Sequence, residues 1–176
     1  MELNLTMIGN DNVSLRPLYK QDAHVIASLA DNPRVAANLR DVFPSPYRFE
    51  DAVQFIELVQ RGTFGFCRAI LYRDQFAGVI SITPQSDVYR HSAEIGYWLG
   101  EPFWNLGIMT AAIELTCAHA FNQLGITRIF AGVFGGNEAS KAVLMKNGFK
   151  LEGVKTKGVL KNNRLLDEYF LALVKP

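Results

Sequence analysis

The stretch WNLGIMT, residues 104–110, joins two segments of different character. Before it stands the aromatic-rich run AEIGYWLGEPF, residues 93–103. After it comes AAIELTCAHAFNQLG, residues 111–125, which has no proline and no glycine before its last residue. The first pattern is typical of a strand and the second of a long helix. The one glycine of the joint, Gly107, therefore stands where a strand gives way to a helix.

A glycine at the start of a helix lets a ligand approach the backbone closely. The first N–H groups of a helix have no partner within it, and the aligned peptide dipoles favour an anion there. Gly107 could thus belong to a phosphate or pyrophosphate site, or could equally do no more than turn the chain. The segment lacks both the Gly-Lys-Ser/Thr of a Walker loop and the three glycines of a dinucleotide fingerprint, which argues against those two sites.

The remaining sequence predicts an α/β fold with a mixed sheet. Apolar alternation and β-branched runs predict strands at residues 13–18, 64–72, 76–84, 92–99, 128–134, 150–160 and 165–174. Helical spacing predicts helices within residues 19–33, 44–62, 111–125 and 137–149. In the second helix, Val53, Ile56 and either Val59 or Gln60 are expected to mark successive turns. We expect a mostly antiparallel central sheet of about seven strands flanked by about four helices, with residues 1–176 forming one domain.

Composition narrows the possible functions. A net charge of +1, from 18 basic and 17 acidic residues, provides no overall field that would favour nucleic acid or a membrane surface. The N-terminal residues lack the pattern of a secretory signal, so a cytoplasmic protein is expected. The two cysteines, Cys67 and Cys117, lie in apolar segments and are expected to be buried and free. The three histidines have no metal-site spacing, so no metal is expected.

Four separated blocks resemble one family. They are VSLRPLYKQDA (13–23), AEIGYWL (93–99) with the following WNLGIMT, NEASKAVLMKNGFKLEG (137–153), and Asp167 before the run EYFLALV (168–174). In this order they resemble the GNAT N-acetyltransferases of the RimJ/RimL ribosomal-protein type, across nearly the whole chain. The resemblance implies a GNAT fold, acetyl-CoA as cosubstrate without a metal, and transfer of the acetyl group to a primary amine.

The resemblance also implies a pyrophosphate loop at the joint. The loop of the family usually reads Gln/Arg-x-x-Gly-x-Gly/Ala, which Gly107 matches and which Trp104 and Met109 do not. Asn105 and Leu106 replace a glycine and a lysine that are often found there, so backbone amides are expected to carry the binding. The residues that the resemblance assigns to the cofactor here are Trp104, Asn105, Leu106, Gly107, Ile108, Met109 and Thr110.

Two further blocks match the cofactor-binding and catalytic parts of the family. The strand EIGYWL is expected to separate from its neighbour, so that backbone groups of Tyr97, Trp98 and Leu99 bind the pantetheine arm. The side chains of Tyr97 and Trp98 could contact the cofactor or lie in the core. Asn137 and Ser140 fit an N-x-x-S block, in which the asparagine binds the pantetheine amides and can also cap the helix. Ser140 is the candidate general acid, and the segment 137–149 contains no tyrosine.

Glu94 is the candidate general base for the acceptor amine, although it could equally be a solvated carboxylate at a strand end. Some members of the ribosomal-protein branch carry a glutamate base after the last helix, but the corresponding KTKGVLKNN (155–163) has no acidic residue. The acceptor, a protein N-terminus or a small metabolite, therefore stays open, and a homodimer is compatible with the sequence. The alternatives are a non-catalytic acyl-CoA-binding module and a protein interaction domain that no longer binds the cofactor.

Overall fold

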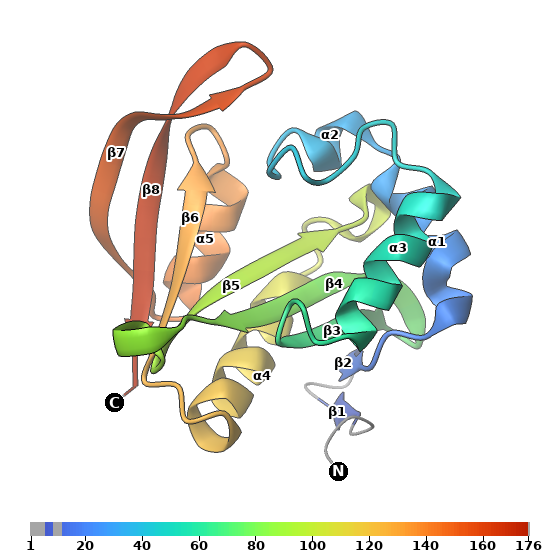
Figure 1. The fold of residues 1–176 in the computed structure, drawn as a ribbon, viewed down its shortest axis with the longest axis horizontal. Helices are drawn as coiled ribbons and strands as arrows, with labels where there is room; N and C mark the ends of the chain where they lie inside the picture. The colour runs from blue at the N-terminus through green and yellow to red at the C-terminus, as the bar shows by residue number, and fades with distance from the viewer. Residues whose placement is uncertain (1–5, 9–11, 176) are drawn as a thin grey trace.

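The computed structural model describes residues 6–8 and 12–175. Within these residues eight strands form one sheet in the order β1-β2-β3-β4-β5-β6-β8-β7, with helices on both faces (Figure 1). The strands are β1 (Met7–Ile8), β2 (Val13–Arg16), β3 (Phe66–Tyr72), β4 (Gln75–Pro84), β5 (Ser92–Leu99), β6 (Arg128–Phe134), β7 (Lys150–Lys161) and β8 (Arg164–Val174). The helices are α1 (Ala23–Ala30), α2 (Pro33–Ala36), α3 (Phe49–Gln60), α4 (Ile108–Gln123) and α5 (Glu138–Lys146), with 3-10 turns η1 (Lys20–Asp22), η2 (Asp87–Tyr89) and η3 (Glu101–Phe103).

The predicted fold class is confirmed. All seven predicted strands are present, and every pairing is antiparallel except that of β5 with β6. The sequence did not predict the two-residue strand β1 or the short helix α2. Asn32 and Pro33, interpreted as the end of a helix, also begin α2, because the Asn32 side chain accepts a hydrogen bond from the Arg34 amide at 2.9 Å.

A hydrophobic layer lies on each face of the sheet. On one face α4 packs through Ile113, Cys117 and Ala120, and Gly125, just beyond the end of the helix, takes the left-handed conformation. The other face is covered by α1 and α3. On α3, Ala52 and Ile56 are buried against this face, whereas Val53 is 36% exposed. The side chains at i and i+4 therefore form the stripe of α3 that contacts the sheet.

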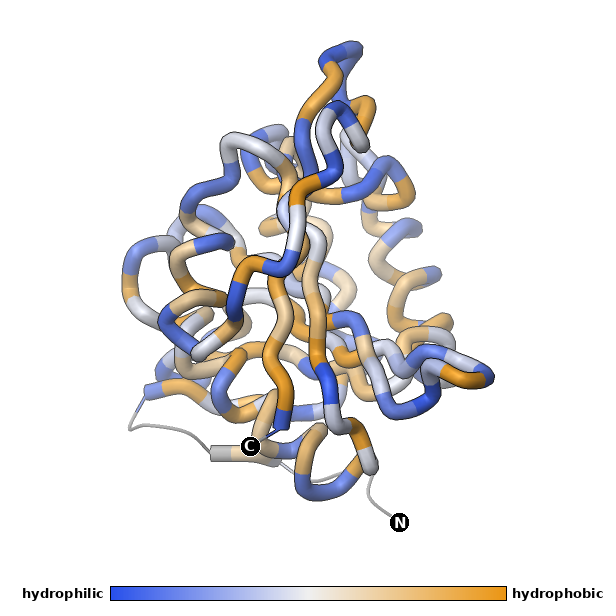
Figure 2. The backbone as a smooth tube through the Cα atoms, turned by 90° about the vertical axis from the view of Figure 1, so that its left-hand side faces the viewer, coloured by the Kyte–Doolittle hydropathy of each residue, from blue (hydrophilic) through white to orange (hydrophobic). Residues whose placement is uncertain are grey.

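The hairpin of β7 and β8 forms one edge of the sheet. Figure 2, which faces this hairpin, shows hydrophilic and hydrophobic residues alternating along it, and most side chains of β7 are exposed. Asp167 controls its shape. Its Oδ1 accepts a hydrogen bond from the Lys157 amide at 2.8 Å, where β7 bulges, and its carbonyl accepts one from the Gly135 amide at 2.8 Å. Asp167 thereby fixes the hairpin to the end of β6.

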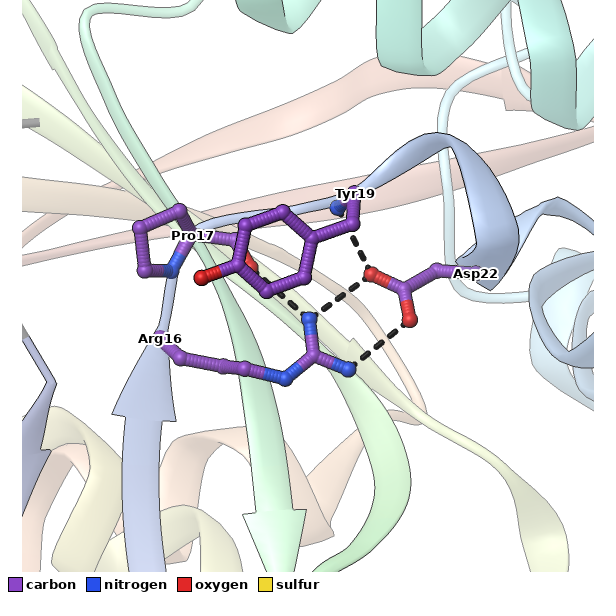
Figure 3. A network of polar contacts seen from close by, with 4 residues as sticks. All are labelled: Arg16, Pro17, Tyr19 and Asp22. Carbon is purple, nitrogen blue, oxygen red and sulfur yellow. Dashed lines mark hydrogen bonds and ion pairs between the residues drawn. The ribbon is translucent and has the colours of Figure 1, made fainter. Parts of the chain in front are cut away.

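A buried ion pair closes the turn that leads from β2 into α1. Arg16 binds both carboxylate oxygens of Asp22 at 2.8 Å, and the Tyr19 amide donates to the same carboxylate at 2.8 Å (Figure 3). The Arg16 guanidinium also donates to the Pro17 carbonyl at 2.8 Å. The Asp22 side chain is only 5% exposed, so its charge depends on these donors for compensation. The hydrogen bonds to Asp22 also raise the pKa of Arg16.

We expect Asp22→Asn to lower the free energy of unfolding by about 3 kcal/mol, since it leaves Arg16 without its anionic partner in a mostly buried site. The matched control is Glu152→Gln, which breaks the bidentate pair of Glu152 with Arg128 on the surface. That control should lose less than about 1 kcal/mol. Urea denaturation of the two variants makes the comparison, and equal losses would show that burial does not govern the first pair.

Candidate functional site

The strands β5 and β6 pair only where they begin. Their parallel register joins Ser92 to Arg128, Ala93 to Ile129 and Glu94 to Phe130, and it ends there. Beyond this point β5 continues to pair with β4, and β6 continues to pair with β8. Figure 1 shows β5 and β6 diverging toward their ends. Residues 95–99 of β5 therefore have no strand partner on the side of β6 among the described strands.

Side chains of β5 alternate between the two faces of the sheet. Trp98 belongs to the layer under α1 and α3 and contacts Phe43 edge-on, with ring centroids 5.9 Å apart. Tyr97 packs instead against the layer under α4. Both aromatic side chains are therefore packed in the interior layers, one on each face. By the same alternation Glu94 shares the face of Trp98.

The hydroxyl of Tyr97 lies 2.8 Å from the Oγ of Ser140, which stands in the first turn of α5. Burial raises the pKa of Tyr97 to about 12, against a smaller lowering by the hydrogen bond to Ser140. The phenol thus keeps its proton at neutral pH. No sequence pattern predicts this pair, because the two residues belong to different elements and are 43 positions apart.

Asn137 positions Ser140 by capping α5. Its side-chain Oδ1 accepts a hydrogen bond from the Ser140 amide at 3.2 Å, so the predicted cap is confirmed. At the other end of the helix, Asn147 donates to the Thr110 carbonyl at 3.2 Å and so joins α5 to the first turn of α4. These contacts hold Ser140 and the start of α4 in one arrangement.

The helix α4 begins at Ile108, directly after Gly107, as the sequence predicts. Gly107 has a φ of +74°, and a Cβ built on it would meet nothing within 4 Å, so open space lies beside the helix start. Ile108 and Met109 are buried, at 1% and 7% exposure, and their side chains belong to the core. The first amides of α4 are thus presented by residues whose side chains point inward.

Glu94 does not stand free in solvent. Arg40, in the segment between α2 and α3, donates a hydrogen bond to Glu94 Oε1, and the Glu94 side chain is 28% exposed. The same segment is tied to the end of β7, because Lys161 Nζ lies 2.7 Å from Asp41 Oδ1. The face that carries Glu94 is therefore bordered by this segment and by the hairpin of β7 and β8.

The model of the acetyltransferase (GNAT) domain family matches residues 12–150. The chain belongs to the GNAT acetyltransferase family. It is 30% identical to the uncharacterized N-acetyltransferase YoaA of Bacillus subtilis (strain 168), over 97% of each chain. Its relatives are named N-acetyltransferases, and this chain is one as well. Solved structures of RimL and RimJ share its fold.

Two solved structures resemble this GNAT N-acetyltransferase closely. RimL, a ribosomal L7/L12 alpha-N-protein acetyltransferase in complex with coenzyme A, has a TM-score of 0.86 at 22% identity and covers 97% of this chain and 98% of its own. The microcin C7 self-immunity acetyltransferase MccE, in complex with acetyl-CoA and AMP, has a TM-score of 0.82 at 26% identity. That match covers 94% of this chain and 93% of MccE. Structural neighbours of this GNAT protein thus bind coenzyme A or acetyl-CoA.

Trp104, where the loop departs from the family pattern, braces this GNAT protein's loop against β5. Its Nε1 donates to the Leu99 carbonyl at 2.9 Å, so that carbonyl already has a partner. The Arg34 guanidinium lies 5.2 Å from the centre of the indole and pairs with Glu101, which also accepts a hydrogen bond from Asn32 at 2.7 Å. Asn105 and Leu106 are exposed, and Asn105 has a φ of +61°.

Glu168 is an acidic residue that the sequence reasoning missed. Its side chain is 14% exposed and lies over Gly132 of β6, where a Cβ would come within 2.4 Å of Oε1. Lys155 Nζ lies 3.5 Å from this carboxylate. Phe134 and Glu168 are register partners, so Glu168 shares the face of Phe130 and Glu94. An acidic residue inside the apolar run EYFLALV was the signal that could have drawn attention to it.

Two observations concern metals and membranes. Among residues 6–8 and 12–175, no group of three or more histidine, cysteine, aspartate or glutamate side chains could hold a metal ion. In the same residues, no helix has the length and apolar character needed to cross a membrane. Cys67 and Cys117 are both free and buried, as expected from the sequence.

We expect Tyr97→Phe to flatten the alkaline loss of stability. The folded pKa of about 12 lies above the ordinary value of 10.0, so the native state binds more protons than the unfolded state between these values. Raising the pH from 8 to 11 should therefore lower the free energy of unfolding of the unaltered protein by about 1 kcal/mol through this group. The Tyr97→Phe variant should not show this loss. Urea denaturation at each pH measures this, and Ser140→Ala should keep the loss because burial is its main cause. Parallel curves for the tyrosine variant and the unaltered protein would contradict the assignment.

Proposed function

We propose that this protein moves the acetyl group of acetyl-CoA to a primary amine by direct attack in a ternary complex, without a covalent acyl-enzyme. One observation carries the proposal. Where β5 separates from β6, Glu94 lies on one face of the sheet, and the hydroxyls of Tyr97 and Ser140 meet on the other. An amine and a leaving thiol on opposite sides of a thioester need a base and an acid on opposite faces.

The main chain offers the features that acetyl-CoA would need. In the stretch Tyr97, Trp98 and Leu99 the backbone groups alternate between β4 and the side of β5 that has no strand partner, and the pantetheine arm would pair with the groups on the open side as an added strand does. The amides at the start of α4 would bind the pyrophosphate beside the open space at Gly107. We assign the cofactor contacts to the loop residues Trp104, Asn105, Leu106, Gly107, Ile108, Met109 and Thr110, together with Asn137 and Ser140.

The proposed chemistry assigns one proton transfer to each face. Glu94 accepts a proton from the acceptor ammonium, directly or through water, and the free amine attacks the thioester carbonyl. The carbon–sulfur bond breaks, and Ser140 gives its proton to the departing thiolate. The amine nitrogen loses its second proton to water as the amide forms, and water resupplies the proton of the hydroxyl pair. Tyr97 can then return a proton to Ser140, since the two oxygens are 2.8 Å apart. Tyr97 thus joins Ser140 and Glu94 as a proposed participant.

The acceptor of the acetyl group is a primary amine, and membership of the family supports both a protein N-terminus and a small molecule in that role. A protein N-terminus is supported by the ribosomal L7/L12 acetyltransferase RimL among the structural neighbours, and a small amine fits the same chemistry. We place the reaction in the cytoplasm, while a homodimer stays a prediction. The ion pair of Glu94 with Arg40 favours one alternative, a non-catalytic acyl-CoA-binding module, because it engages the proposed base.

Gly107→Ala should weaken acetyl-CoA binding at least about tenfold in calorimetry, because a side chain forces the loop out of the positive φ that presents the amides. Gly125→Ala is the matched control at the other end of α4. Gly125 has a φ of +65°, and a Cβ there also meets nothing within 4 Å. Both variants should lose about 1–2 kcal/mol of stability, and only the first should lose affinity. Equal affinities would remove the loop from the cofactor site.

Ser140→Ala and Glu94→Gln should each lower kcat about 10²-fold with acetyl-CoA and a good amine, the low end for a positioned proton transfer. In calorimetry, Glu94→Gln should leave the acetyl-CoA affinity unchanged, and Ser140→Ala should weaken it less than it lowers kcat, because the backbone carries most of that binding. A loss confined to affinity would reassign Ser140 to binding, and an unaltered kcat would remove the residue concerned from the catalytic set. Cofactor binding without turnover across an amine panel would support the non-catalytic module.

A further inference from the structure

The ion pair of Arg40 with Glu94 lies where the acceptor would meet the thioester. Glu94 is the last residue of β5 that pairs with β6, and it faces the side of the sheet opposite to Ser140. Arg40 reaches it from the segment between α2 and α3, and the Arg40 side chain is 65% exposed. The proposed base is therefore held by a cation that is open to solvent.

Such a pair can exchange partners at little cost. Exposed ion pairs contribute about 0–1 kcal/mol, so an incoming carboxylate has little to overcome. A guanidinium carries five N–H donors, and among the described residues Arg40 uses one nitrogen, Nη2, for a hydrogen bond to Glu94. The other donors can receive a second carboxylate before Glu94 leaves. Arg40 thus fits the recognition of an anion that the substrate itself brings.

We propose that the acceptor is a free α-amino acid, whose carboxylate takes the place of Glu94 on Arg40 and thereby releases Glu94 to accept the proton of the amine. This inference rests on the proposed acetyltransferase function and names its substrate class. In an α-amino acid the amine and the carboxylate share one carbon atom, so both reach a neighbouring cation and anion at once. Binding of the acceptor would thereby free Glu94 to act as the general base.

Charge balance separates this acceptor from a simple amine. An amino acid enters as a zwitterion, and the four charges then alternate: Arg40, acceptor carboxylate, acceptor ammonium, Glu94. A simple ammonium brings a second positive charge beside Arg40 and offers nothing to replace Glu94 there. It must compete with Arg40 for Glu94, and the like charges repel each other. The ion pair therefore selects for the carboxylate.

Two carboxylates that border this site, Asp41 and Glu168, are held by lysines. Lys161, which is 8% exposed, holds Asp41 at 2.7 Å, and Lys155 lies 3.5 Å from Glu168. Asp41 is adjacent to Arg40 in sequence but is engaged with the hairpin, so it does not replace the substrate on Arg40. Of these three ion pairs, the one between Arg40 and Glu94 is therefore the pair that an acceptor can rearrange.

The transfer step balances in this arrangement. Glu94, once released, takes one proton from the acceptor ammonium, and the amine nitrogen forms a bond to the acetyl carbon. The bond from that carbon to sulfur breaks, and the thiolate takes the Ser140 proton. The nitrogen loses its second proton to water as the amide forms, and Ser140 regains a proton from water through Tyr97, whose hydroxyl is 2.8 Å away. The products are an N-acetyl amino acid and coenzyme A. The product amide carries no positive charge, so Glu94 loses its new partner and can return to Arg40.

The experiment compares the twenty L-amino acids with their C-terminal amides, in steady-state assays with acetyl-CoA and the full chain. Each pair differs only in the carboxylate. The amide group withdraws electrons and makes the neighbouring amine easier to deprotonate, so intrinsic reactivity favours the amides. We expect at least one amino acid to exceed its amide by about tenfold or more in kcat/KM, the effect of a hydrogen bond between charged groups. Amides that equal or exceed every acid would overturn the inference, as would turnover restricted to peptides.

Arg40→Gln tests the residue itself. It should lower kcat/KM for the preferred amino acid about tenfold or more and leave its amide unchanged or improved, because Glu94 is then free without a carboxylate. Arg61→Gln is the matched control, an exposed arginine paired with Glu57 on α3 at 3.7 Å. Equal losses for acid and amide in Arg40→Gln would make Arg40 a structural contact and overturn the inference. Absent acetyl-CoA binding and absent turnover with every amine would instead overturn the proposed function itself.

Discussion

The site depends on one feature of the backbone, the end of hydrogen bonding between β5 and β6 after three residue pairs. Each strand keeps its other neighbour, so the sheet stays intact on both sides of the separation. Because side chains of a strand alternate, a strand with one unpaired edge reaches both faces of the sheet at the same point. Glu94 and Tyr97 take opposite faces for this reason, and every other part of the site is arranged around them.

The sequence predicted those parts of the fold and site that local chemistry determines. Gly107 and Gly125 limit α4 as expected, and the cap by Asn137 is confirmed because capping depends on a few neighbouring residues. Contacts between segments that are far apart in the sequence could not be predicted from it. Glu94 meets Arg40 across 54 positions, and Tyr97 meets Ser140 across 43. No periodicity or motif encodes such pairs, since they depend on how the sheet and its covering segments come together.

The loop after β5 shows how a departure from a family pattern can still be packed well. Trp104 stands where the family usually has a polar residue, and its side chain has a structural role. Its indole donates a hydrogen bond to the Leu99 carbonyl and stacks under Arg34. Met109 is buried in the layer under α4 and supports the helix start from below. These side chains shape the loop, while Gly107 stays exposed at its surface directly before α4.

The orientation of these side chains also bears on how such a loop can evolve. Main-chain amides are the same in every residue except proline, so substitutions that preserve the turn leave the amides of residues 104–110 in place. The amino-acid identities in this segment can therefore change as long as the backbone conformation is kept. A comparison that scores side-chain identity will underestimate kinship here, whereas the positive φ of Gly107 and the buried faces of Ile108 and Met109 provide a steadier signature of descent.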